Sequence, residues 1–361
     1  MPTKDLPSVV LRASGNSHHS HQVIAGYIAL AHARELDLRI AWSRRDRSLP
    51  SDAWVLAEID GLTIGYDLDD GDVLDPVVVD AFADDTDVLF RRSRPITPNG
   101  TYRSEAKHRA LGLNYHATTR HPYFWNAAFR SNVGIRRFGA LAGAEWSRSA
   151  RLRVADPEAD DGKILFQTRL WEPATRTTSL SAKERWRADD RDAINQDRID
   201  LIRALRAEFG DRFQGGLSPT DHALAVAPDL VLPVGRSNPA AFLRASRTAR
   251  VCLTTRGLWN SNGWKLAEYF AQGCAVVCER PMHEAPGLEE GRQYLGFSSV
   301  DEALEAVHRV DADTAGRSRL RAEARRYFDR YVEPSALVRR SLRVAVSGQD
   351  ADPAPGAEVL T

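Results

Sequence analysis

The segment 257–263 (GLWNSNG) has glycine at both ends and precedes a pattern typical of a helix. Lys265 falls in the first turn of this helix and Glu268 in the second. Backbone amides and the positive end of the helix dipole attract anions, and a lysine beside them adds a full charge. The combination predicts a site for a phosphate or diphosphate. The alternative is a capped surface helix with a solvated lysine.

Glu268 lies three residues after Lys265, on the same face of the predicted helix. One interpretation is a salt bridge between the two side chains. The other is that Glu268 accepts hydrogen bonds from two hydroxyl groups of a ribose, which suits a nucleotide lying across the helix end. Both interpretations stay open on the residues alone.

A strand, a helix and a parallel strand are expected around these residues, at 251–255, 264–272 and 274–278. Their length is that of a βαβ unit. An earlier apolar strand at 163–168 is followed directly by Arg169. Ligands of open α/β sheets bind at the carboxyl ends of the strands, so Arg169 and the 257–263 loop are expected at the same edge.

The first half of the chain also alternates strands with helices, which favours a mostly parallel sheet. Strands are expected at 8–12, 38–42, 54–59, 62–66, 87–91 and 111–116, and helices at 21–36 and 76–83. His18 follows the first of these strands, within GNSHHSH. An unperturbed pKa near 6.5 makes histidine a suitable general base, so His18 is a candidate catalytic residue. A surface loop or a helix cap is the alternative.

Three aspartates and three arginines in this half each have two interpretations. The aspartates are interpreted as an acidic turn in preference to a metal-binding DxD signature: Asp67, Asp69 and Asp70. The arginines either contact an anionic acceptor or form a solvated basic edge: Arg91, Arg92 and Arg94.

The composition predicts a two-domain globular protein, because 361 residues exceed what one hydrophobic core usually supports. Lys+Arg 49 balances Asp+Glu 49, so no overall attraction to nucleic acid is expected. No segment approaches the ~20 apolar residues of a membrane span, and 1–30 lacks a secretory signal pattern. A cytoplasmic protein is expected, with buried free thiols at Cys252, Cys274 and Cys278.

The stretch 257–297 (GLWNSNGWKLAEYFAQGCAVVCERPMHEAPGLEEGRQYLGF) with the following SSVDEALEAV resembles the donor-binding half of GT-B glycosyltransferases, including their spore-protein-like and group 1 members. FQTRLW at 166–171 and NQDRIDLIRALRAEFGDRFQGG at 195–216 are similar to the rest of the same module. The resemblance covers about residues 163–310. Residues 1–150 match only in being α/β.

The resemblance implies an α/β protein with two Rossmann-like domains facing across a cleft. The expected order is an N-terminal acceptor domain at 1–155, a linker at 156–162, a nucleotide-sugar-binding domain at 163–325, closing helices at 326–346 that return to the first domain, and a disordered tail at 347–361.

The implied function is transfer of a sugar from a nucleotide diphosphate donor to an acceptor such as a glycan, a lipid-linked or a natural-product hydroxyl, with no metal and no cofactor. Glu268 then holds the ribose, and Lys265 and Arg169 neutralise the diphosphate. The loop residues that face the sugar or its phosphates are Asn260, Ser261 and Gly263. A nucleotide-sugar epimerase or hydrolase, and a non-catalytic nucleotide-sugar-binding partner protein, are the alternatives.

One position departs from the resembled family. Retaining members usually have a glutamate eight residues before the ribose-binding one, and this chain has Asn260 there. The departure favours an inverting reaction with His18 as the base. It also keeps the non-catalytic alternative open.

Overall fold

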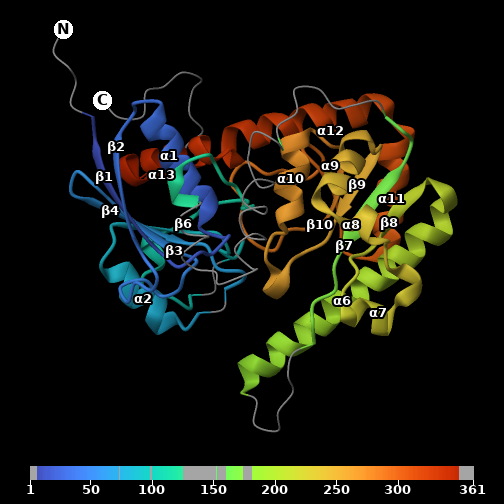
Figure 1. Cartoon of the computed structure of the whole chain (residues 1–361), viewed down its shortest axis with the longest axis horizontal. Helices are drawn as coiled ribbons and strands as arrows, with labels where there is room; N and C mark the ends of the chain where they lie inside the picture. The colour runs from blue at the N-terminus through green and yellow to red at the C-terminus, as the bar shows by residue number, and fades with distance from the viewer. Residues whose placement is uncertain are drawn as a thin grey trace. The chain divides into compact units, whose positions relative to one another are not determined.

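The computed structural model of the chain describes residues 6–72, 74–97, 100–124, 152, 160–173 and 181–348. The chain divides into two compact units, whose helices and strands are labelled in Figure 1. The first unit comprises Met1–Arg151, His283–Pro286 and Asp329–Thr361. The second comprises Leu152–Met282 and Gly287–Phe328. Each unit has one sheet with helices, so the predicted α/β class with two Rossmann-like units is confirmed.

The sheet of the first unit has six strands in the order β2-β1-β3-β4-β5-β6. Their bounds are β1 Ser8–Ser14, β2 Asp37–Ser43, β3 Trp54–Ile59, β4 Leu62–Asp67, β5 Val88–Arg91 and β6 His108–Ala110. Three neighbouring pairs are parallel, but β3 is antiparallel to both β1 and β4. The β3–β4 connection is a tight hairpin, because Asp60 (φ 47°) and Gly61 (φ 87°) both adopt the left-handed conformation that a two-residue turn requires.

The strand predicted at 111–116 is wrong. β6 ends at Ala110, and the backbone carbonyl groups at this point are bonded to a side chain. The Arg340 guanidinium donates to the carbonyl oxygens of Ala110 and Leu111, both at 3.2 Å from Nη1. Because this partner is 230 residues away from Ala110 in the sequence, no local pattern reports it.

The first unit also contains the last helix of the chain. Its α-helices within the described residues are α1 His21–His32, α2 Pro76–Asp84 and α13 Pro334–Ser347. Residues of α13 belong to the same hydrophobic core as α1 and the sheet. The Tyr66 hydroxyl on β4 lies 2.9 Å from the Tyr27 hydroxyl on α1 and 2.8 Å from Ser341 Oγ on α13. The expected return of the closing helix to the first domain is thus confirmed.

The sheet of the second unit has five parallel strands in the order β11-β10-β9-β7-β8. Their bounds are β7 Ile164–Thr168, β8 Phe213–Leu217, β9 Val251–Thr254, β10 Val276–Glu279 and β11 Leu295–Phe297. β7 comes first in the chain and lies between β8 and β9, so the chain changes direction across the sheet there. The carboxyl ends of β7 and β9 form a topological switch point, the usual ligand position in doubly wound domains.

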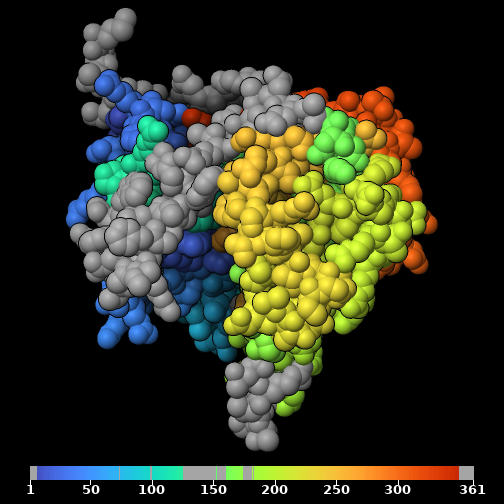
Figure 2. Space-filling view, turned by 45° about the vertical axis from the view of Figure 1, so that its right-hand side comes forward, coloured from blue at the N-terminus to red at the C-terminus, as the bar shows by residue number. Residues whose placement is uncertain are grey.

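The helices of this unit are α6 Ala182–Phe209, α7 Asp221–Val226, α8 Val234–Ser237, α9 Pro239–Thr248, α10 Trp264–Gln272, α11 Val300–Ala312 and α12 Thr314–Tyr327. The segment with α7, α8 and α9, yellow in Figure 2, forms a broad part of the surface of the unit. Asn238 caps α9, because its Oδ1 accepts from the Ala241 amide at 2.9 Å. Ser181 and Glu184 form a capping box at the start of α6.

Two composition-based expectations can be compared with the described residues. No helix among them is long and apolar enough to cross a membrane. The three cysteines are free and buried, as predicted. Most of the predicted linker (156–159) and the predicted tail from 349 onward lie outside the described residues.

Candidate functional site

Arg198 on α6 joins the two loops at the switch point of the second unit. Its side chain is buried and donates to the Arg169 carbonyl oxygen at 2.7 Å. It also donates to Thr255 Oγ1 at 3.1 Å and to the Arg256 carbonyl oxygen at 2.9 Å. Burial lowers the pKa of Arg198 to about 10, so the group stays charged at neutral pH. A buried positive charge therefore connects the ends of β7 and β9.

The loop after β9 has a strained backbone. Trp259 (φ 54°) and Asn260 (φ 62°) are both in the left-handed region, which is unfavourable for residues other than glycine. Asp190 on α6 holds this conformation, because its Oδ2 accepts from the Trp259 amide at 2.8 Å. Strain of this kind is concentrated at functional sites, where the surrounding structure maintains it.

Gly263 lets α10 begin close to the end of β9. A Cβ atom at this position would lie 2.7 Å from the Thr255 carbonyl oxygen, closer than ordinary contacts allow. The N-terminus of α10 also has no side-chain cap. A helix N-terminus without a side-chain cap beside two strand ends is a geometry suited to an anion.

Lys265 and Glu268 lie one turn apart at this end of α10. Lys265 is half-buried, and its Nζ lies 3.7 Å from the centroid of the Phe242 ring. Burial lowers the pKa of Lys265 and raises the pKa of Glu268. No ion pair within 4.0 Å joins the two side chains in the part of the chain that the structure describes, so the close salt bridge considered above does not form. Their opposite charges still interact, since Glu268 partly offsets the effect of burial on the pKa of Lys265, and Lys265 does the same for Glu268.

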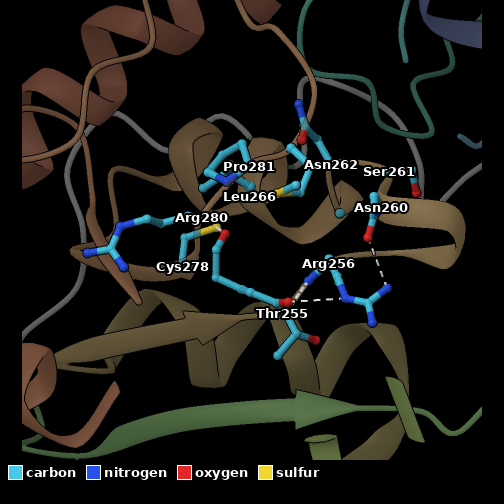
Figure 3. Close-up of a pocket in the computed structure, with 12 residues that line it drawn as sticks. Thr255, Arg256, Asn260, Ser261, Asn262, Leu266, Cys278, Arg280 and Pro281 are labelled. Carbon is cyan, nitrogen blue, oxygen red and sulfur yellow. Dashed lines mark hydrogen bonds and ion pairs between the residues drawn. The ribbon is translucent and has the colours of Figure 1, made fainter. Parts of the chain in front are cut away.

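A small pocket lies between the carboxyl ends of β9 and β10, next to the start of α10 (Figure 3). It encloses about 10 Å³, roughly the space of one water molecule, and the rest of the hollow is open to solvent. Asn260, Ser261 and Gly263 line it, whereas Arg169, Lys265 and Glu268 do not. Arg169 is exposed, with its guanidinium 3.9 Å from the centroid of the Trp171 ring.

Three charged residues of this site were not predicted. The Arg256 amide donates to Glu279 Oε2 at 2.9 Å, and Arg256 Nε lies 3.2 Å from Glu279 Oε1. Arg256 Nη1 also bonds Asp190 and lies 3.3 Å from Asn260 Oδ1. Glu279 could have been predicted as a site residue, because it lies at the carboxyl end of a strand. Asp190 could not, because its partner Arg256 is 66 residues away in the sequence.

His18 lies in the first unit, in the segment after β1, and its side chain keeps solvent exposure. Its ring stacks on that of His116, with centroids 4.0 Å apart. Partial burial lowers the pKa of His18, so the ring is neutral and can accept a proton at pH 7. His21 Nδ1 lies 3.0 Å from His116 Nε2. No group of three or more His, Cys, Asp or Glu among the described residues has a geometry that could hold a metal ion.

The structure contradicts a solvated basic edge at two of the arginines. Arg91 and Arg92 are 1% and 2% exposed. Arg91 donates to Asp67 at 3.0 Å, and Arg92 lies 2.6 Å from Asp70. These pairings also support the structural interpretation of the aspartates. Arg94 is paired with Glu105 and Glu284.

Residues 200–340 match a family model described as Glycosyl transferase-like. This part of the chain is similar to glycosyltransferases. The match confirms the resemblance stated above and identifies the protein as an enzyme of the transferase class. No curated protein matches the sequence.

Several solved structures share a distant likeness with the chain. Sucrose-phosphate synthase from Thermosynechococcus elongatus is 12% identical over 94% of this chain and 73% of its own, with a TM-score of 0.42. AviGT4, a glycosyltransferase involved in avilamycin A biosynthesis, is 16% identical over 93% and 92%, with a TM-score of 0.39. A UDP-N-acetylglucosamine 2-epimerase is 11% identical over 98% and 99%, with a TM-score of 0.43. Likeness at this level says nothing of the activity of this chain.

The second unit contains every predicted donor-site residue. All six lie at the carboxyl edge of the second sheet or in the first two turns of α10: Arg169, Asn260, Ser261, Gly263, Lys265 and Glu268. The predicted base, His18, belongs to the other unit. The roles of these residues stay predictions.

Proposed function

We propose that the protein transfers a sugar from a nucleoside diphosphate donor to an acceptor hydroxyl, and that its own cations, without a metal ion, neutralise the diphosphate. The observation that carries the proposal is the pair Arg198 and Lys265 at the switch point. Arg198 is buried among carbonyl and hydroxyl oxygens, and Lys265 lies over an aromatic ring. Neither has an ion-pair partner among the described residues.

A diphosphate is the anion that suits this arrangement. Arg198 is buried and Lys265 is half-buried, and no carboxylate among the described residues lies within 4.0 Å of either charge, so an anionic ligand that contacts them directly gains a closer pairing. The N-terminus of α10 adds backbone amides and the positive end of the helix dipole. When the bond from the anomeric carbon to the diphosphate oxygen breaks, negative charge grows on the leaving group, and the same cations stabilise it.

Glu268 and His18 take the other two roles in the proposal. Glu268 accepts hydrogen bonds from the ribose hydroxyl groups of the nucleotide. His18 takes the proton of the acceptor hydroxyl as its oxygen forms the new bond to the anomeric carbon. Both residues have the required chemistry, a carboxylate without an ionic partner and a neutral imidazole.

The test is calorimetric titration with ADP, GDP, UDP and pyrophosphate. Lys265→Met removes the charge at similar volume and is expected to weaken both pyrophosphate and the preferred nucleoside diphosphate about tenfold or more, since charge-assisted hydrogen bonds are worth about 1.5–3 kcal/mol. Glu268→Gln is expected to weaken the nucleoside diphosphate only. Lys183→Met, which removes an exposed lysine on α6, is the control and leaves both unchanged.

Several results contradict the proposal. A folded Lys265→Met variant with unchanged affinity removes the diphosphate assignment. Donor consumption without any acceptor indicates the epimerase or hydrolase alternative, and tight binding without turnover indicates the non-catalytic one. Loss of turnover after treatment with EDTA contradicts metal independence.

A further inference from the structure

The pocket between β9 and β10 has a distinctive polar lining. Of the described residues that line it, Glu279 alone carries a carboxylate. The other polar groups include the amide of Asn260, the hydroxyls of Thr255 and Ser261, and the guanidinium of Arg256. The pocket is open to solvent on one side, so a ligand that lies across its opening can reach these polar groups.

The Glu279 carboxylate is held in place and still reachable. Its two oxygens contact the Arg256 amide at 2.9 Å and Arg256 Nε at 3.2 Å. The side chain keeps 22% exposure. Each carboxylate oxygen has two lone pairs, so both oxygens can accept a further hydrogen bond from a ligand.

Asn260 contacts the same guanidinium, so it lies close to Glu279. A guanidinium only donates hydrogen bonds, so the Asn260 atom that lies 3.3 Å from Arg256 Nη1 is the amide oxygen (Figure 3). The NH2 group of Asn260 then keeps its two donors. Arg256 thereby orients two hydrogen-bonding groups: the Glu279 carboxylate, which accepts, and the Asn260 NH2 group, which donates.

We propose that Glu279, positioned by Arg256, is the carboxylate that binds hydroxyl groups of the transferred sugar, with Asn260 as the donor beside it. A hydroxyl group both donates and accepts, so two neighbouring sugar hydroxyls match a carboxylate next to an amide NH2. Position 260 has asparagine where retaining members of the resembled family usually have glutamate, and Glu279 at the end of β10 supplies a carboxylate instead. The inference rests on the proposed function.

The experiment compares two ligands that differ only in the sugar. Calorimetric titration measures the affinity for the preferred diphosphate among ADP, GDP and UDP, and for its glucose conjugate. Glu279→Gln is expected to reduce the extra affinity of the conjugate about tenfold, because the charged acceptor is lost, and to leave the affinity for the diphosphate within twofold. The matched control is Glu208→Gln, the same change on α6 at a carboxylate that pairs with His308.

A second variant tests the neighbouring amide while Glu279 stays unchanged. Asn260→Gly retains the left-handed backbone and removes only the amide, so it is also expected to weaken the conjugate and not the diphosphate. Equal weakening of both ligands by Glu279→Gln means that Glu279 only supports the loop, and no change in either ligand means that it does not contact the sugar. Either result overturns the inference while the proposed function survives. Absence of diphosphate binding in the unmodified protein overturns the proposed function, and this inference with it.

Discussion

Hydrogen bonds fix the protonation of the histidines beside His18. Asn16 Oδ1 accepts from His21 Nε2 at 3.2 Å, so His21 Nδ1 carries no proton and accepts from His116 Nε2 at 3.0 Å. Both rings are neutral, since burial lowers the pKa of His21 well below its usual value and that of His116 to about 3. His18 thus stacks on an uncharged ring.

The pH dependence of turnover follows from this environment. The pKa of His18 is lowered from 6.5, so the free base persists below the pH at which an unperturbed histidine is protonated. We expect the acidic limb of kcat/KM in a pH–rate profile to have its midpoint below pH 6.5. A midpoint above pH 6.5 assigns the base to another group.

The matching variant is His18→Ala, which is expected to lower turnover by about 10² to 10⁴ while diphosphate binding persists. His308→Ala on α11, where the histidine pairs with Glu208, is the control and keeps normal turnover. Steady-state kinetics of the two variants measure the difference. Near-normal turnover of His18→Ala contradicts the assignment.

Among single residues, the sequence predicts a site where the partners are close in the sequence. Lys265 and Glu268 are one helical turn apart, so their spacing alone places them together. Glu279 and Arg256 are 23 residues apart and meet only because β9 and β10 are adjacent. Such a contact becomes predictable after the strand order is known.

At the scale of elements, the unit β9–α10–β10 was the most predictable part of the chain. A strand, a glycine-bounded loop, a helix and a parallel strand follow each other within a local stretch, so each boundary has its own sequence signal. β6 was predicted at the wrong residues because the bonds that end it come from Arg340. The register of such a short strand depends on distant partners.

The close approach of α10 to β9 gives a prediction about stability. Gly263→Ala places a methyl group 2.7 Å from the Thr255 carbonyl oxygen, and overpacking of this kind costs about 1–3 kcal/mol. Gly235→Ala in α8 is the control, since a Cβ there has nothing within 4 Å and a helical alanine is neutral or stabilising. Thermal unfolding of both variants measures the contrast. Equal melting temperatures mean that the start of α10 can shift without cost.

At the scale of the whole molecule, each unit is built from separate segments of the chain. The first unit takes α13 from the end of the sequence and His283–Pro286 from the middle of the second. The length of the chain predicted two domains, because it limits only the total size of a hydrophobic core. It could not predict that His283–Pro286 belongs to the first unit, since the partners of this segment, such as Arg94 for Glu284, are nearly two hundred residues earlier.

The contribution of α13 to the first unit can be measured. Leu342 is 1% exposed, so Leu342→Ala is expected to destabilise this unit by about 2–5 kcal/mol. Val346→Ala removes a side chain that is 65% exposed and should change stability by no more than about 0.5 kcal/mol. Hydrogen exchange resolves the location: amides of β1 and β3 lose protection in Leu342→Ala, whereas those of β7 and β9 do not. Equal loss in both sheets means that the two units unfold together.

The place of α13 also determines the order in which the protein is completed during synthesis. Domains usually fold as units as they leave the ribosome, the N-terminal one first. Here the first unit lacks a helix of its core until the last part of the chain is made, while all of Leu152–Phe328 has already been synthesised. The half that is translated first is therefore the half that is completed last, and its unfinished core must remain in contact with water, or with a chaperone, until α13 arrives.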